Sequence, residues 1–185
     1  MKWPSHNPLS DYVNNNLNIY KDWPKPGINY LNTVDICRDF DLFKVTVDWY
    51  SQVATHVDAS ALFAADARGF LWSAPVAVQN KIPLHVVRKK GKMPGELLSR
   101  EYQLEYGTDV LEIAKIDKPP GKVLIIDDEL ATGGTAEAIC KLLHDGLGIE
   151  YKDIELAVLL NLTFLPGEKV LNDLGVAVKN LINVN

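Results

Sequence analysis

Apolar residues recur every three or four positions along residues 39–57 (DFDLFKVTVDWYSQVATHV), which predicts an amphipathic helix. The repeat consists of Phe40, Phe43, Val47, Tyr50, Ala54 and Val57. Asp39 and Asp41 are both suitable N-caps, because a short acidic side chain accepts a hydrogen bond from the unpaired N–H groups of the first turn. The pattern therefore predicts one helix with a single buried face.

Further along the chain, short apolar runs alternate with segments of helical pattern. The predicted strands are 61–65 (ALFAA), 83–87 (PLHVV), 111–116 (LEIAKI), 122–127 (KVLIID), 154–162 (IELAVLLNL) and 176–183 (VAVKNLIN), and the predicted helices are 70–79 and 136–147. The 111–116 run alternates in polarity and is expected to pair antiparallel. Several other strands lack a polar face, which predicts an α/β fold with a mostly parallel central sheet flanked by helices.

Residues 88–109 (RKKGKMPGELLSREYQLEYGTD) do not share this pattern. The stretch carries five basic residues and three glycines, with weak periodicity. A connection of this length without strong structure is usually a functional lid or a disordered linker. Its charge and its position between two strands favour a flexible lid loop.

Composition narrows the class of protein. The 185 residues, 47% of them hydrophobic and 23% charged, are ordinary for a single globular domain spanning 1–185. A net charge of −5 argues against general binding to nucleic acid or anionic membranes, although a local basic cluster can still bind a small anion. We see neither a membrane-length apolar run nor a signal peptide. Cys37 and Cys140 have no metal or redox spacing, so free thiols in a reducing cytoplasm are the simplest interpretation.

Candidate chemistry concentrates in residues 123–139 (VLIIDDELATGGTAEAI). Asp127 and Asp128 end an apolar run, and Thr132-Gly133-Gly134-Thr135 leads into a predicted helix. Unpaired N–H groups and the helix dipole favour a phosphate at a helix N-terminus, and glycines let it approach the backbone. Carboxylates accept hydrogen bonds from sugar hydroxyls and bind a magnesium ion or its waters. The combination predicts a site for a ribose 5-phosphate.

Other interpretations of this segment are less suitable. It lacks the lysine of the P-loop pattern GxxxxGK[ST], and it does not match GxGxxG. A purely structural turn is the main alternative, in which the glycines relieve strain and the aspartates cap the helix. Two carboxylates, a polar loop and an apolar strand in this order favour the ligand site.

The stretch VLIIDDELATGGTAEA closely resembles the phosphoribosyl-diphosphate binding signature of the type I phosphoribosyltransferases. Three further segments resemble the adenine phosphoribosyltransferase family in their order and spacing. They are DWPKPGI (22–28), ADARGFLWSAPVAV (65–78), and RKKGKMPG with EYQLEYGTDVLEI (88–95 and 101–113). The resemblance covers about residues 20–165 and implies the type I phosphoribosyltransferase fold.

The resemblance also implies an activity. Such a protein transfers the 5-phosphoribosyl group from phosphoribosyl diphosphate to adenine, giving AMP and diphosphate in purine salvage. It uses Mg²⁺, lies in the cytoplasm and is usually a homodimer, with no nucleic-acid or membrane partner. Two alternatives stay open: the same chemistry on another purine base, such as hypoxanthine or guanine, and a non-catalytic sensor of phosphoribosyl diphosphate.

Site residues follow from the resemblance, position by position. Asp127 and Asp128 would hold the ribose hydroxyls, with any magnesium ion nearby. The 5-phosphate would be bound by Ala131, Thr132, Gly133, Gly134 and Thr135, and the diphosphate by Arg68, Arg88, Lys89 and Lys92. Glu105 would be the acid–base group near the purine. The alternatives are a surface salt bridge for Arg68, a solvated basic loop for the other cations and an exposed charge for Glu105.

The sequence departs from the family pattern in two places. After PGI the family usually has an aromatic residue, an arginine and an aspartate, whereas this chain continues Asn29-Tyr30-Leu31-Asn32. The resemblance makes Asn29, Tyr30 and Leu31 the base-binding residues, so the identity of the base depends on this departure. Glu129 replaces a leucine within the signature and adds a third acid beside the aspartates.

Overall fold

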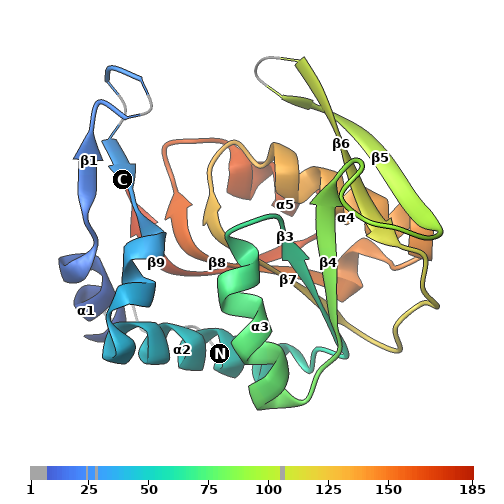
Figure 1. Cartoon of the computed structure of the whole chain (residues 1–185), viewed down its shortest axis with the longest axis horizontal. Helices are drawn as coiled ribbons and strands as arrows, with labels where there is room; N and C mark the ends of the chain where they lie inside the picture. Colours follow the sequence, from blue (N-terminus) through green and yellow to red (C-terminus); the bar gives the residue numbers. More distant parts are fainter. Residues whose placement is uncertain (1–7, 24, 28, 105–106) are drawn as a thin grey trace.

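The computed structural model describes residues 8–23, 25–27, 29–104 and 107–185 (Figure 1). Its elements, in order, are α1 (Pro8–Asn16), β1 (Ile19–Lys21), β2 (Asn29–Leu31), the 3-10 helix η1 (Thr33–Arg38), α2 (Phe40–Val57), β3 (Ala61–Ala65), α3 (Gly69–Asn80), β4 (Leu84–Lys89), β5 (Leu97–Leu104), β6 (Gly107–Ala114), β7 (Val123–Leu130), α4 (Gly134–Leu147), the 3-10 helix η2 (Tyr151–Asp153), β8 (Ile154–Leu162), α5 (Gly167–Leu174) and β9 (Ala177–Val184). No helix within these residues is both long and apolar enough to cross a membrane.

Seven strands of the described part form one sheet in the order β5-β6-β4-β3-β7-β8-β9, and β1 and β2 form a separate hairpin. β3 pairs in parallel with β4 and β7, and the parallel pairing continues from β7 to β8 and β9. β6 runs antiparallel to both β4 and β5. The structure therefore confirms the predicted mostly parallel sheet and the antiparallel element near residues 111–116.

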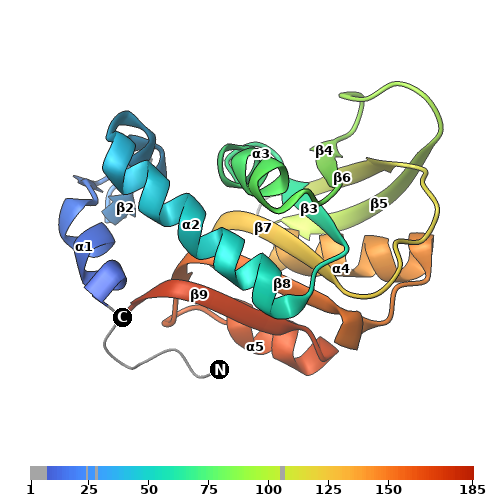
Figure 2. The ribbon, with the colours of Figure 1, turned by 90° about the horizontal axis from the view of Figure 1, so that it is seen from below.

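Helices cover both faces of this sheet, as Figure 2 shows. Leu124 and Ile126 of β7 belong to a buried cluster that includes Trp49 of α2 and Trp72 of α3. The intervening Ile125 belongs to a second cluster on the opposite face, formed with α4 and α5. Because neighbouring residues of β7 are buried on opposite faces, the strand has no polar side until it reaches the aspartates.

Most predicted elements are present, with small shifts in their ends. β3 and β8 have the predicted bounds, and α2 begins after Asp39, whose side chain accepts a hydrogen bond from the Leu42 backbone N–H at 2.9 Å. β7 is longer than the predicted strand, because its pairing with β8 continues to Leu130 and Asn161. Both aspartates and Glu129 therefore lie within the strand.

The predicted lid loop differs most from the structure. Residues 97–104 and 107–114 form the hairpin β5–β6, paired from Leu97 and Ala114 to Leu104 and Gly107. The hairpin projects from the sheet beside α4 (Figure 1). Its inner side is apolar: Leu98 and Tyr102 pack against the core cluster that contains α4. Weak periodicity along the sequence therefore concealed an ordered antiparallel pair.

Candidate active site

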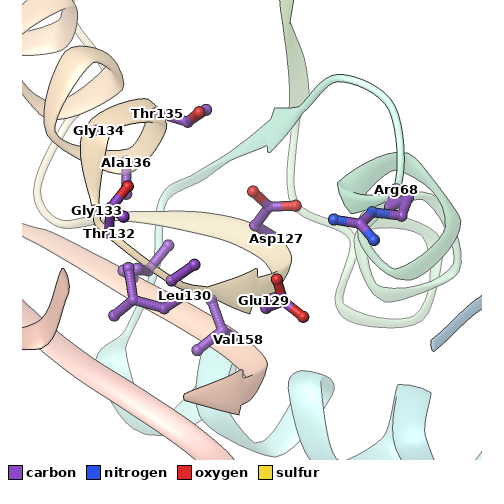
Figure 3. Close-up of a pocket in the computed structure, with 12 residues that line it drawn as sticks. Arg68, Asp127, Glu129, Leu130, Thr132, Gly133, Gly134, Thr135, Ala136 and Val158 are labelled. Atoms are coloured by element: carbon purple, nitrogen blue, oxygen red, sulfur yellow. The ribbon is translucent and has the colours of Figure 1, made fainter. Parts of the chain in front are cut away.

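A pocket of about 180 Å³ lies at the carboxyl end of β7, between the β7–α4 loop and the start of α3 (Figure 3). Its lining residues are Arg68, Asp127, Glu129, Leu130, Ala131, Thr132, Gly133, Gly134, Thr135, Ala136, Leu156 and Val158. All five residues expected to hold a 5-phosphate are among them. The carboxyl ends of parallel strands are the usual place for ligands in open α/β sheets.

The loop from Ala131 to Thr135 passes directly into α4. Gly133 is the N-cap with φ of 89°, a left-handed conformation that favours glycine. A Cβ on Gly133 would lie 2.9 Å from the Cα of Gly167, the first residue of α5. The Gly167 N–H donates to the Ala131 carbonyl oxygen at 3.1 Å. Two glycines thus allow the backbones of the loop and α5 to touch, which fixes the loop at the N-terminus of α4.

Strand alternation separates the two aspartates. Asp127 and Glu129 line the pocket, whereas Asp128 does not and is only 1% exposed. Successive side chains of a strand point to opposite faces, so two adjacent aspartates on β7 do not face the pocket together. Asp127 therefore lines the pocket without Asp128, and the expected contact of both aspartates with the ribose hydroxyls stays a prediction.

Two hydrogen bonds fix the position of Asp127, one to its backbone carbonyl and one to its carboxyl group. The Tyr50 hydroxyl donates to the Asp127 carbonyl oxygen at 2.7 Å, and the Asp128 N–H donates to Asp127 Oδ1 at 2.9 Å. Burial, followed by the charge of Asp128, raises the pKa of Asp127 well above its ordinary value. Burial also raises the pKa of Glu129, with Asp128 adding to the effect. Burial therefore disfavours the charged form of both acidic side chains that line the pocket.

Asp128 is the centre of a buried network behind the pocket wall. Thr33 Oγ1 donates to Asp128 Oδ2 at 2.6 Å, and Arg68 Nε lies 3.1 Å from the same oxygen. Asp128 Oδ1 is buried and has no hydrogen-bond partner among the described residues. The network joins three segments that are far apart in sequence: η1, the β3–α3 loop and β7.

Arg68 reaches both this network and the pocket. It precedes Gly69, where a Cβ would lie 2.5 Å from the Ile126 carbonyl oxygen, so only glycine lets α3 start this close to β7. Its Nη1 donates to the Tyr30 hydroxyl. Burial lowers the pKa of Arg68, but the nearby carboxylates, Asp128 first, outweigh that effect and raise it. The peptide bond between Asp66 and Ala67, just before this residue, is cis.

The residues expected to bind the base lie at the edge of this arrangement. Asn29, Tyr30 and Leu31 form β2, and none of them lines the pocket. Tyr30 is connected to the site through Arg68, whose guanidinium lies 5.8 Å from the centre of the Tyr30 ring. The Tyr30 ring also packs against Trp23, with 4.5 Å between the ring centroids. Of the three residues, the structure therefore brings Tyr30 to the site and leaves Asn29 exposed.

The remaining cations expected at the diphosphate do not line the pocket. Arg88 and Lys89 belong to the end of β4, where Arg88 pairs with Asp66 at 3.1 Å and Lys89 with Asp109 at 2.9 Å. Lys92 is exposed in the turn that follows. Glu105, the expected acid–base group, lies outside the described residues.

Three residues that support the site carried no signal in the sequence. Thr33, Tyr50 and Gly167 act on the site across 95, 77 and 36 positions of the chain, as the separations of their partners show. Tyr50 was identified only as an apolar position of a helix. Hydrogen bonds between segments this distant leave no local pattern, so only the structure identifies these residues.

The chain has relatives among known sequences and neighbours among solved structures. No protein-family model matches the chain. The chain is 42% identical over 163 residues to the adenine phosphoribosyltransferase of Mycoplasmopsis agalactiae, covering 88% of this chain and 93% of the relative. It is 39% identical over 174 residues to that of Shigella flexneri, covering 93% of each.

Two solved structures have the same architecture. The adenine phosphoribosyltransferase from Thermoanaerobacter pseudethanolicus superposes with a TM-score of 0.84 at 34% identity, covering 95% of this chain and 99% of that one. The adenine phosphoribosyltransferase from Saccharomyces cerevisiae, complexed with D-2,5-dideoxy-2,5-imino-altritol 1,6-bisphosphate and adenine, superposes with a TM-score of 0.82 at 30% identity, covering 94% and 98%. Sequence identity at this level extends over nearly the full length of both chains, and the superposed structures share the same architecture. The chain has the type I phosphoribosyltransferase fold and belongs to the adenine phosphoribosyltransferase family.

Proposed function

We propose that this chain transfers the 5-phosphoribosyl group from phosphoribosyl diphosphate to adenine, giving AMP and diphosphate. One observation carries the proposal: a single pocket combines a glycine loop at a helix N-terminus with carboxylates two residues apart on β7. The related protein from Saccharomyces cerevisiae was crystallised with a sugar-like bisphosphate and adenine. A ligand with a phosphate at one end and hydroxyls in the middle fits this pocket, with the phosphate at the glycine loop and the hydroxyls at the carboxylates.

The 5-phosphate is proposed to bind the loop Ala131–Thr135. Backbone N–H groups at the start of α4 have no partner within the helix, and the helix dipole adds positive charge there. Thr132 and Thr135 offer hydroxyl donors. Gly133 and Gly134 leave room for the phosphate oxygens next to the backbone.

The reaction builds positive charge on the ribose ring as diphosphate leaves. Asp127 is placed to accept a hydrogen bond from a ribose hydroxyl and to stabilise that charge, since it faces the pocket beside the phosphate loop. Arg68, on the opposite side of Asp127 from the loop in Figure 3, is proposed to meet the leaving diphosphate. Asp128 holds the Arg68 guanidinium in position through its Nε.

Magnesium is proposed as the metal ion of the reaction, and the residues fit it. Asp127 presents a carboxylate to the pocket, and the buried Oδ1 of Asp128 has no protein partner among the described residues. The same residues contain no group of three or more side chains able to hold a metal ion alone. Mg²⁺ suits such a site, because it is usually bound by one or two carboxylates together with substrate phosphates and waters. When bound, it neutralises charge on the diphosphate.

The hairpin β5–β6 is proposed to act as a lid. Closing it over the pocket would exclude the water that otherwise intercepts the ribosyl cation. Arg88, Lys89 and Lys92 stand where β4 leads toward the hairpin and are proposed to meet the diphosphate in that closed state. Glu105 is proposed to manage a proton on the purine, and Asn29, Tyr30 and Leu31 to contact the base.

A homodimer in the cytoplasm completes the proposal. The outer face of α3 carries Leu71, Ala74 and Val78, spaced three and four residues apart and all exposed. An apolar helix face of this kind is suited to a subunit interface. Cys37 and Cys140 are both free, which is typical of a reducing compartment.

The test is a direct assay of the reaction. Protein incubated with adenine, phosphoribosyl diphosphate and Mg²⁺ should form AMP and diphosphate in equal amounts, measured by chromatography. Asp127→Asn should lower the turnover by roughly 100-fold or more, the scale typical for losing one stabilising group in an active site. Asp117→Asn, an exposed carboxylate outside the pocket, is the matched control and should be unaffected. Absence of AMP formation by the unsubstituted protein would overturn the proposal.

A further inference from the structure

Glu129 is the feature of the pocket that the family signature does not explain. It stands where the signature has leucine, yet it lines the same pocket as Asp127 and the phosphate loop. Strand geometry places it on the same face as Asp127, about 7 Å further along β7. The pairing of β7 with β8, which aligns Asp127 with Val158 and Glu129 with Leu160, holds both residues in a regular strand.

The carboxylate of Glu129 is not used by the protein itself. Among the described residues it has neither a hydrogen bond nor an ion pair, although Arg68 is near enough to interact with its charge. Arg68 instead forms an ion pair with Asp128 through its Nε and donates a hydrogen bond to the Tyr30 hydroxyl through its Nη1. A partly buried carboxylate without donors costs free energy, and donors from a ligand would offset that cost.

Figure 3 shows where such donors would come from. The side chains of Asp127 and Glu129 lie between the glycine loop and the guanidinium of Arg68. A ribose whose phosphate occupies the loop has its hydroxyl groups in this middle region. The purine amine is a weaker candidate, since the residues expected to bind the base do not line the pocket.

We infer that Glu129 is a further ribose-binding residue, whose carboxylate accepts a hydrogen bond from a sugar hydroxyl beside Asp127. The inference rests on the proposed function and deepens it by naming the contact that this chain adds. Glu129 thereby makes the pocket select ribonucleotides over deoxyribonucleotides more strongly than Asp127 would alone. It touches the substrate and not the protein network behind the wall.

Binding of three nucleotides by calorimetry tests this. AMP, 2′-deoxy-AMP and 3′-deoxy-AMP are titrated into the unsubstituted protein, Glu129→Leu, Glu129→Gln and the control Glu150→Gln, an exposed glutamate. Hydrogen bonds to a charged group are about twice as strong as neutral ones, so the ratio of deoxy-AMP to AMP dissociation constants should fall roughly tenfold in Glu129→Leu for one of the two analogues. Glu129→Gln should lose part of this discrimination, and Glu150→Gln should keep all of it.

The outcomes separate the inference from the proposed function. If Glu129→Leu weakens the binding of all three nucleotides equally, or changes the binding of none, the sugar contact is overturned. Binding of AMP by the unsubstituted protein would still support the proposed function. Failure of the unsubstituted protein to bind AMP at all would overturn the proposed function and this inference together. Thermal melting of each variant without nucleotide confirms that folding is retained, so a lost ratio reports the contact itself.

Discussion

Thr33 and Arg68 share one carboxylate oxygen of Asp128, and this shared contact shows how single residues set the site. The two donors come from η1 and from the loop before α3. The sequence identified Asp128 as one of two adjacent acidic residues, but it did not show to which face of the strand the Asp128 side chain points. Only the pleat of β7, which continues beyond the apolar run, turns it away from the pocket and toward Thr33.

Thr33→Val should destabilise the protein, because the valine removes a buried hydrogen bond of 2.6 Å without changing the shape of the side chain. Leaving a buried acceptor with one donor fewer costs about 1–3 kcal/mol. Urea unfolding measures this loss directly. Thr163→Val, which removes hydroxyl bonds at an exposed position, is the control and should change the unfolding free energy by much less. Equal losses in the two variants would contradict the importance of the Asp128 network.

At the scale of elements, prediction from sequence succeeded where the pattern was local. β3 is a continuous apolar run and β8 is apolar except for Glu155 and Asn161, and the bounds of both were predicted as observed. β5 and the first half of β6 were missed, because their support comes from pairing between strands and from Leu98 lying against Gly146 of α4. The short β1 and β2 also depend on each other and have few apolar residues of their own. Pairing and packing between distant segments decided these elements.

Contact between the phosphate loop and α5 should be essential for nucleotide binding. A methyl group on Gly167 would overlap the Ala131 carbonyl oxygen, so Gly167→Ala must displace the loop. We expect the AMP dissociation constant to rise at least tenfold, measured by calorimetry. Gly146→Ala is the control, since the nearest atoms to its added methyl group all belong to the side chain of Leu98 and none to the phosphate loop. Unchanged AMP affinity in Gly167→Ala would show that the loop does not need this support.

Basic residues near the lid should act on the diphosphate and not on the monophosphate. Alanine at Lys89 and Lys92 together should raise the KM for phosphoribosyl diphosphate at least several-fold while leaving the AMP dissociation constant nearly unchanged, because AMP has no diphosphate. Lys169→Ala, which removes an exposed cation from α5, is the control. Equal effects on both ligands would place Lys89 and Lys92 in the structure or at the monophosphate instead.

Over the whole molecule, ligand binding should appear as thermal stability. A ligand that binds only the folded state stabilises it by about 2.7 kcal/mol at 100 times its dissociation constant. AMP, or phosphoribosyl diphosphate with Mg²⁺, should therefore raise the melting temperature by several degrees, whereas ATP and NAD at the same concentration should do far less. A larger shift with ATP or NAD would indicate a site for another nucleotide.

The choice of purine base is the decisive property of this enzyme to measure. Turnover is compared on adenine, hypoxanthine and guanine at equal concentrations, with saturating phosphoribosyl diphosphate and Mg²⁺. A site built to hydrogen-bond one purine edge rejects its analogue by several powers of ten, because the mismatch leaves buried polar groups unpaired. Membership of the adenine phosphoribosyltransferase family predicts AMP as the dominant product, despite the departure at Asn29 to Asn32. Faster formation of IMP or GMP than of AMP would contradict adenine as the preferred base.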